Sequence, residues 1–240
     1  MSDGAVSPID LDEFEAVLVA CGVRPAFDRA ADRPFVPVRR LVRAFADLIG
    51  SDDEMIAASY AFQSVVGRLA APTLTGAIVL GCAPTFVSAD VRWGVGMYGP
   101  TFGAGAPRVV PTSPDDGLDL LLGIVAELAA AMRTEVRIAR RLLMGNAAAA
   151  LLATLRRIGS RRGVDGAACV ALATRTIDAL GDPPVAALVE LDGWTTFQRR
   201  TCCLLRFAGA RGVCDECSFL DGPTFRDTQR AVWRGLATSG

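Results

Sequence analysis

The chain has 240 residues, of which 51% are hydrophobic and 21% charged, so it can bury a sizeable core in one domain or in one domain with a small appendage. Its formal net charge is −1, without the basic excess that is typical of nucleic-acid binders. All 25 basic residues are arginine and histidine is absent, which excludes histidine acid–base chemistry, histidine metal ligands, lysine Schiff bases and the lysine of a phosphate-binding loop.

Helix-start signals occur along the whole chain. Ser7-Pro8 with a first-turn acid, and likewise Ser113-Pro114, supply a cap and a proline at the first helical position. Ser51 and Glu54 have the spacing of a capping box. Together with apolar stripes at helical spacing, these signals predict helices over about 8–21, 38–49, 54–70, 114–128, 136–158, 166–180 and 223–236.

Two internal stretches do not follow the helical pattern. Residues 91–110 place aromatic and β-branched side chains between glycines, which predicts a small antiparallel hairpin or meander. Residues 69–89 carry no charge, but Pro72 and Pro84 interrupt them, so we interpret this stretch as buried core and not as a membrane span.

The predicted fold class is therefore α+β: mainly α-helical, with a small central antiparallel sheet and a C-terminal cysteine-rich segment. We expect a helical domain over 1–190 and a cofactor-binding segment with a final helix over 191–240, packed together as one unit. The break at Gly181-Asp182-Pro183-Pro184 and a short apolar stretch precede the second part.

Cysteine carries the strongest chemical signal. Cys21, Cys82 and Cys169 stand in apolar surroundings and are expected to be buried, inert thiols. The other four follow the spacing C-C-x10-C-x2-C, as Cys202, Cys203, Cys214 and Cys217. The acidic start Met1-Ser2-Asp3-Gly4 lacks the features of a secretory signal, so we expect the cytosol, where thiols stay reduced and clustered cysteines bind metals.

The spacing helps to choose between metals. Four thiolates suit either tetrahedral zinc or an iron–sulfur cluster. Because adjacent side chains diverge in extended backbone, Cys202 and Cys203 can both face one site only if the chain turns there. A two-iron cluster offers two metal atoms and more surface, so the spacing favours [2Fe–2S] over zinc, while a vicinal disulfide or incidental thiols remain a non-metal alternative.

Two motifs resemble a known family, the FhuF-type ferric-siderophore reductases. Arg199-Arg200-Thr201-Cys202-Cys203 followed by Cys214-Asp215-Glu216-Cys217 is similar to the family's C-terminal signature, and Gly145-Asn146 before small residues and Ala-Leu is similar to a second segment. A weaker likeness lies at 68–72. The resemblance implies a [2Fe–2S] cluster on the four cysteines and one-electron reduction of siderophore-bound Fe(III), which releases iron as Fe(II).

The chain also departs from that family's pattern. Relatives often have Cys-Gly-Asp-Cys, whereas this chain has Asp215 and Glu216 between the last two cysteines. Acidic neighbours should lower the reduction potential, since they disfavour the added electron. The chain continues beyond Cys217 to Gly240, and we expect this tail to cover the cluster or to form an interface.

The resemblance implies a docked ferric siderophore and an external electron donor such as a ferredoxin, because no nucleotide-binding fingerprint is present. The candidate substrate contacts are Arg199, Arg200, Arg206, Arg211 and Trp194. Each of these arginines has an alternative interpretation as a solvated surface charge or as a counter-charge to an anionic cluster. For Trp194 the alternative is packing. For Asn146, which follows Gly145, the alternative to a role in the site is a hydrogen bond inside a helix. We expect a cytoplasmic oxidoreductase without nucleic-acid partners or a transmembrane span, with peripheral membrane contact left open. The alternative functions are an electron-transfer or iron-responsive [2Fe–2S] protein and a binding protein with structural zinc.

Overall fold

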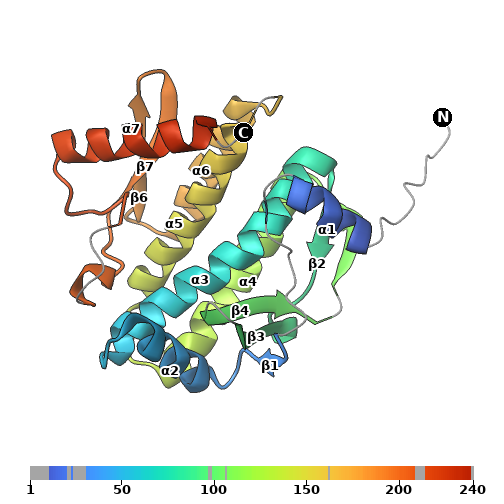
Figure 1. Ribbon diagram of the computed structural model, residues 1–240, viewed down its shortest axis with the longest axis vertical. Coiled ribbons are helices and arrows are strands. Elements are labelled where there is room, and N and C mark those ends of the chain that lie inside the picture. Colours follow the sequence, from blue (N-terminus) through green and yellow to red (C-terminus); the bar gives the residue numbers. More distant parts are fainter. Residues whose placement is uncertain are drawn as a thin grey trace.

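The computed structural model of the chain describes residues 11–20, 23, 31–96, 99–105, 107–161, 163–208 and 214–238. It is mainly helical, with small antiparallel sheets, as the sequence predicts (Figure 1). The helices are α1 (Leu11–Ala20), α2 (Val38–Ile49), α3 (Glu54–Thr75), α4 (Pro114–Glu135), α5 (Arg140–Gly159), α6 (Gly166–Leu180) and α7 (Gly222–Thr238).

The described strands form three antiparallel groups. The strands are β1 (Arg33–Pro34), β2 (Cys82–Thr85), β3 (Val91–Gly96), β4 (Gly99–Ala104), β5 (Arg108–Pro111), β6 (Ala186–Leu191) and β7 (Trp194–Arg199). They pair in the orders β1-β3-β4, β2-β5 and β6-β7. The β3–β4 hairpin confirms the prediction for 91–110, whereas β5 pairs with β2 and not with β4.

Helix α3 is the central element, with a largely buried surface and α5 along its side (Figure 1). The capping-box prediction was wrong in its residue. Asp53, and not Ser51, caps α3 by accepting hydrogen bonds from the backbone N–H groups of Met55 and Ile56, at 2.8 and 3.2 Å. The helix also passes the predicted end at Ala70 and reaches Thr75.

Most other helix boundaries agree with the sequence, but α4 passes the predicted end at Leu128 and reaches Glu135. Ser113 caps α4 through the N–H of Asp116, and Asp165 caps α6 through the N–H of Ala167. Helix α5 starts at Arg140 and not at Val136, because Val136 is extended (φ −122°, ψ 134°) and ends α4. The predicted cap at Ser7 and the predicted stop at Gly22 lie outside the described residues.

The charge-free stretch 69–89 forms the end of α3, a π-helical turn (Gly76–Leu80) and β2. Its residues Leu69, Leu74 and Ala83 are at most 1% exposed, as expected for core, whereas Val79 and Val87 are 39% and 59% exposed. Within the described residues, no helix is long and apolar enough to cross a membrane.

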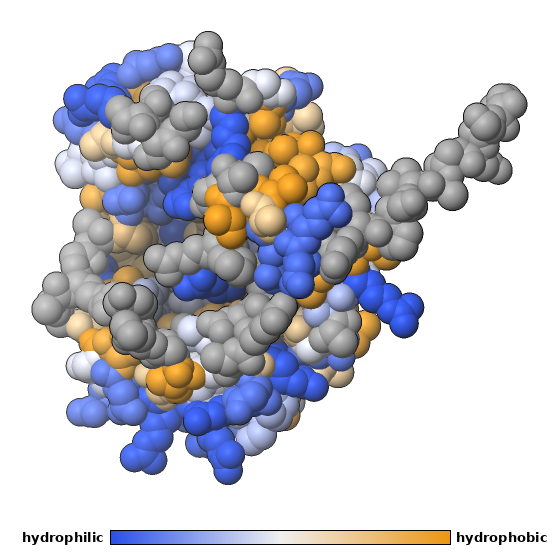
Figure 2. All heavy atoms as spheres, turned by 45° about the vertical axis from the view of Figure 1, so that its right-hand side comes forward, coloured by the Kyte–Doolittle hydropathy of each residue, from blue (hydrophilic) through white to orange (hydrophobic). Residues whose placement is uncertain are grey.

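A second hairpin, β6–β7, was not predicted. Its turn is Asp192-Gly193, where both residues have positive φ (52° and 83°). Helix α7 lies beside this hairpin, and Trp233 of α7 stacks on Trp194 of β7 with ring centroids 4.6 Å apart. Figure 2 shows a hollow between the part of the molecule that carries α7 and the part that carries α2, with hydrophilic side chains at its border.

Candidate metal centre

The two cysteine pairs lie at opposite ends of the segment that connects β7 to α7. Cys202 and Cys203 follow β7, and Cys214 and Cys217 precede α7. The backbone N–H of Arg199, at the end of β7, donates to the carbonyl of Glu216 at 3.0 Å. This bond brings the pairs together, and the sulfurs of Cys203 and Cys214 are 3.8 Å apart.

Both pairs lie on turns. The N–H of Cys217 donates to the carbonyl of Cys214 at 3.0 Å, which closes the C-x2-C turn. Asp215 and Glu216 are not among the positive-φ residues, so the turn does not need the glycine that relatives of the resembled family have. After Cys203 the chain bends at Leu204, whose φ of 67° is uncommon for a residue with a Cβ. Its N–H donates to the sulfur of Cys202 at 3.2 Å, so the chain changes direction directly after the two adjacent cysteines.

The thiols differ in burial and in pKa. Cys203 and Cys217 are buried, whereas Cys202 and Cys214 are half-buried. Because the sulfurs of Cys203 and Cys214 share a hydrogen bond, the pKa of Cys203 is lowered to about 6 and that of Cys214 is raised. Burial raises the pKa of Cys202. Across the described part of the chain, no three cysteine or carboxylate side chains converge closely enough to hold one metal ion.

Arg199 lies behind the cysteines as a buried cation, 2% exposed. Its guanidinium donates to Oε1 of Gln63 at 3.1 Å, to the carbonyl of Thr201 at 3.2 Å and to Oδ1 of Asn146. All three acceptors are neutral, and no described carboxylate lies within ion-pair distance of it. The guanidinium favours the thiolate forms of Cys202, Cys203 and Cys214. A buried arginine enclosed in this way has no surface that a docked chelate could contact. Its position therefore fits the interpretation of Arg199 as a counter-charge to an anionic cluster, and not its interpretation as a substrate contact.

The Gly145-Asn146 motif supports the same segment from α5. Asn146 Nδ2 donates to the carbonyl and the hydroxyl of Ser59 at 2.9 and 2.8 Å, and the Ser59 hydroxyl donates to the carbonyl of Cys203 at 2.6 Å. A Cβ at Gly145 would lie 1.7 Å from Oγ1 of Thr201, so only glycine permits this close approach. Oγ1 of Thr201 is itself buried without a hydrogen-bond partner.

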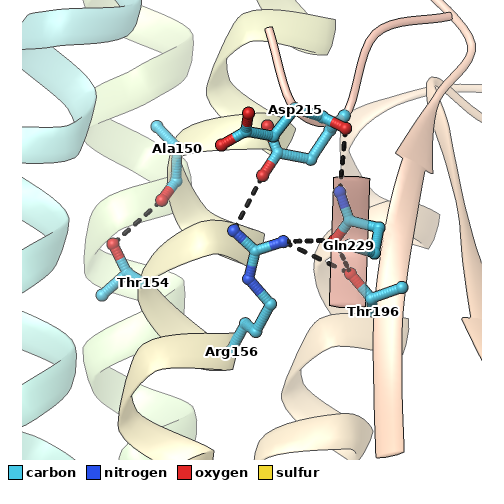
Figure 3. Close-up of polar contacts among 7 residues, drawn as sticks. Ala150, Thr154, Arg156, Thr196, Asp215 and Gln229 are labelled. Atoms are coloured by element: carbon cyan, nitrogen blue, oxygen red, sulfur yellow. Dashed lines mark hydrogen bonds and ion pairs between the residues drawn. The ribbon is translucent and has the colours of Figure 1, made fainter. Parts of the chain in front are cut away.

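A second network, centred on Arg156 of α5, holds the C-x2-C turn from the other side (Figure 3). Arg156 pairs with Glu216 at 2.8 Å and donates to Oε1 of Gln229 at 2.8 Å. Gln229 also accepts from the hydroxyl of Thr196 at 2.6 Å and donates to the carbonyl of Asp215 at 2.8 Å. The turn is therefore joined to α5, β7 and α7 at once.

The remaining sequence-predicted contacts lie in different surroundings. Arg200 and Arg206 are exposed, and the guanidinium of Arg206 lies 4.4 Å from the ring centroid of Phe219 and 5.4 Å from that of Phe207. Trp194 is half-buried against Trp233, which is the packing alternative. Arg211 lies outside the described residues.

Sequence reasoning missed Ser59, Gln63, Arg156 and Gln229. Of these residues, Ser59 could have been found from the sequence, because it is a polar residue on an otherwise apolar face of α3 and a buried hydroxyl needs a hydrogen-bond partner. Of the isolated cysteines, Cys82 and Cys169 are buried with pKa values raised by burial, as expected, and Cys21 lies outside the described residues.

Comparison with family models, curated proteins and solved structures found no match to this chain.

Proposed function

We propose that the chain is a [2Fe–2S] protein that reduces Fe(III) held by a siderophore. The observation that carries this proposal is the charge of Arg199. A buried guanidinium without a carboxylate partner is costly unless an anion compensates it, and the thiols of Cys202, Cys203 and Cys214 are close enough to interact with it electrostatically. A cluster held by four thiolates would be such an anion.

The residue types of the segment suit this group, although no three of the described ligand side chains converge on one ion. The segment presents four thiols without histidine, and its adjacent cysteines lie at a bend of the backbone. The unpartnered hydroxyl of Thr201, directly before Cys202, is a donor that a cluster sulfur would satisfy. Hydrogen bonds to sulfur and nearby charges are the means by which a protein sets a cluster's reduction potential.

The bound cluster would supply one electron to Fe(III), and an external donor such as a ferredoxin would return it. Hard oxygen ligands bind Fe(II) far more weakly than Fe(III), so the reduced ion leaves the chelate without acid–base help from the protein. This suits a chain without histidine. A cytoplasmic location, where thiols stay reduced, belongs to the same proposal.

The charges around the site modify the expectation of a low potential. The carboxylate of Glu216 is paired with Arg156, so much of its charge is compensated. Asp215 is exposed and screened by water. Arg199 is uncompensated and favours the reduced form, so we expect it to raise the potential against the effect of the two acids.

Purified protein tests the proposal directly. We expect a red-brown protein with an EPR signal on reduction, and we expect Cys203→Ser to lose the cluster while the control Cys82→Ala retains it. Colourless protein with stoichiometric zinc would rule out the cluster, and an intact spectrum in Cys203→Ser would remove Cys203 from the ligand set.

An electron-transfer protein without siderophore specificity is the second candidate. Phe207 and Phe219 are 59% and 58% exposed on both sides of Arg206, close in sequence to Cys203 and Cys217. Aromatic residues and arginine are enriched at protein interfaces. Reduced protein that transfers no electron to any ferric siderophore, measured with a ferrous-iron trap, would favour this candidate.

A further inference from the structure

A groove of about 320 Å³ runs between α3 and α5 and reaches the C-x2-C turn. Gln63 and Ser64 of α3 line one side, Thr154 and Arg157 of α5 line the other, and Glu216 lies at its border. Its size is within the range of small-molecule sites.

Small residues leave the groove open. Gly67 on α3 faces Ala150 on α5, where a Cβ added to the glycine would lie 3.8 Å from the alanine Cβ. Ala149 and Ala153 continue the lining along α5. The lining therefore combines small apolar side chains with hydroxyl, amide and guanidinium groups, which is the usual composition of a ligand site.

The charge of the groove is positive. Arg157 in the last turn of α5 and Arg161, two residues beyond the end of that helix, both line it, and no described carboxylate lies within ion-pair distance of either. Among the described lining residues the one carboxylate is that of Glu216, which is paired with Arg156 at 2.8 Å. Two uncompensated guanidinium groups favour an anionic ligand with oxygen acceptors.

Two groove residues also connect it to the cysteines. Gln63 accepts a hydrogen bond from Arg199, which donates to the carbonyl of Thr201 beside Cys202. Glu216 stands between Cys214 and Cys217. A ligand in the groove therefore lies against the side chains that surround the candidate metal centre.

We propose that the groove between α3 and α5 binds an anionic ferric chelate, of the catecholate or carboxylate class, through Arg157 and Arg161. The proposal rests on the proposed function, because it assigns the substrate class of that reductase. We expect cationic hydroxamate chelates to bind more weakly, because they carry the same sign of charge as the two arginines that line the groove.

Gallium chelates test the binding step alone, because Ga(III) resembles Fe(III) in its ligands but is not reduced. The experiment is calorimetric titration of the full-length protein with a trianionic gallium tris-catecholate and with a monocationic gallium trihydroxamate. We expect the tris-catecholate to bind more tightly, and we expect Arg157→Gln with Arg161→Gln to weaken it about tenfold or more, since two charge-assisted contacts are lost.

The matched control is Arg133→Gln with Arg137→Gln. It removes the same charge from two exposed positions that do not line the groove, Arg133 in the last turn of α4 and Arg137 in the segment before α5. Equal weakening by both double variants would indicate a general charge effect and overturn the groove assignment. Tighter binding of the cationic chelate, or no binding of either chelate, would also overturn it.

The cluster spectrum and the ferrous-iron trap separate this proposal from the proposed function. Wild-type protein that reduces a ferric chelate while the groove variant binds the gallium tris-catecholate normally would overturn the groove and leave the reductase intact. Tight, arginine-dependent binding by a protein that holds zinc would support the groove and overturn the reductase.

Discussion

Two regions of the molecule differ in the share of buried polar contacts that hold them in place. In the helical body, formed by α2 to α5 with their strands, side chains such as Phe62, Val65 and Leu118 are fully buried and pack by shape. Phe45 contributes two ring contacts, stacked on Phe102 at 5.9 Å and edge-on to Tyr60 at 5.5 Å. Such packing gives stability that depends mainly on buried area and volume.

The C-terminal layer, residues 186–208 and 214–238, packs on that body through apolar side chains such as Phe197, which is 1% exposed, and is also attached to it through buried polar groups. Among the described residues, the buried polar or charged ones are Ser59, Thr73, Thr75, Asn146, Thr176, Thr196, Arg199 and Gln229. All of them except the three threonines at 73, 75 and 176 belong to the two networks around the cysteines. Hydrogen bonds are directional, so this attachment fixes the orientation of the cysteine segment where apolar packing would tolerate small shifts.

Among the variants considered, Arg199→Gln should cause the largest loss of stability. It removes the guanidinium from Asn146, Gln63 and the carbonyl of Thr201, and it removes the buried positive charge beside the thiols. We expect a loss of about 3–5 kcal/mol in the free energy of unfolding. In protein that keeps its cluster, the midpoint potential should fall, because an added electron loses a favourable neighbour; urea unfolding and a potentiometric EPR titration measure the two effects.

The neighbouring Arg200→Gln is the matched control. Because Arg200 is exposed, the free energy of unfolding of the Arg200→Gln variant should stay within about 0.5 kcal/mol of that of the wild type. An unchanged midpoint potential in Arg199→Gln would show that Arg199 is a packing residue without electrostatic influence on the cluster.

Gly145→Ala should have a smaller effect and acts through packing beside the cysteines. Alanine normally stabilises a helix interior relative to glycine by about 0.5–1 kcal/mol, and Gly123→Ala on exposed α4 should show that gain. At Gly145 the new methyl group meets Oγ1, Cβ and Cγ2 of Thr201 at 1.7, 2.8 and 3.1 Å, so rotation of the hydroxyl alone does not relieve the contact.

We therefore expect Gly145→Ala to lose about 1–3 kcal/mol and to bind less cluster, as measured by urea unfolding and by iron per chain. If both variants gained stability and kept full iron, the close approach of Thr201 to α5 would not be a constraint on the cysteine segment.

Local signals predicted most of the fold. Ser113 and Asp165 cap helices that begin as expected, and glycine-separated aromatic residues mark the β3–β4 hairpin. The sequence predicts the start of α5 at Val136, four residues too early, because the apolar pattern continues through the non-helical residues before Arg140. The β6–β7 hairpin was missed although Asp192-Gly193 is a typical two-residue turn, whose left-handed backbone suits aspartate followed by glycine.

The candidate site could be predicted only in part. The cysteine spacing and Gly145-Asn146 are local motifs, and both lie at the site. The partners of these motifs are distant in the chain: Arg156 and Glu216 are 60 positions apart, and Ser59 and Cys203 are 144 apart. No periodicity relates such residues, so the pairing of Glu216 with Arg156, which changes the expected effect of that acid on the potential, required the fold.

Trp233→Ala should give the smallest effect and tests whether α7 is part of the layer's attachment. The substitution removes the stack on Trp194, while Gln229 keeps its bonds to Asp215 and Thr196. Because Trp233 is only half-buried, we expect a loss of about 1–2 kcal/mol, which lowers the melting temperature by about 2–4 °C per kcal/mol in a chain of this size. Trp233→Phe, which retains a ring, should lose less, and the iron content of both should equal that of the wild type as long as Gln229 holds the C-x2-C turn. Loss of iron in Trp233→Ala would show that the tail secures the cysteines through its apolar face, and that the polar networks are insufficient on their own.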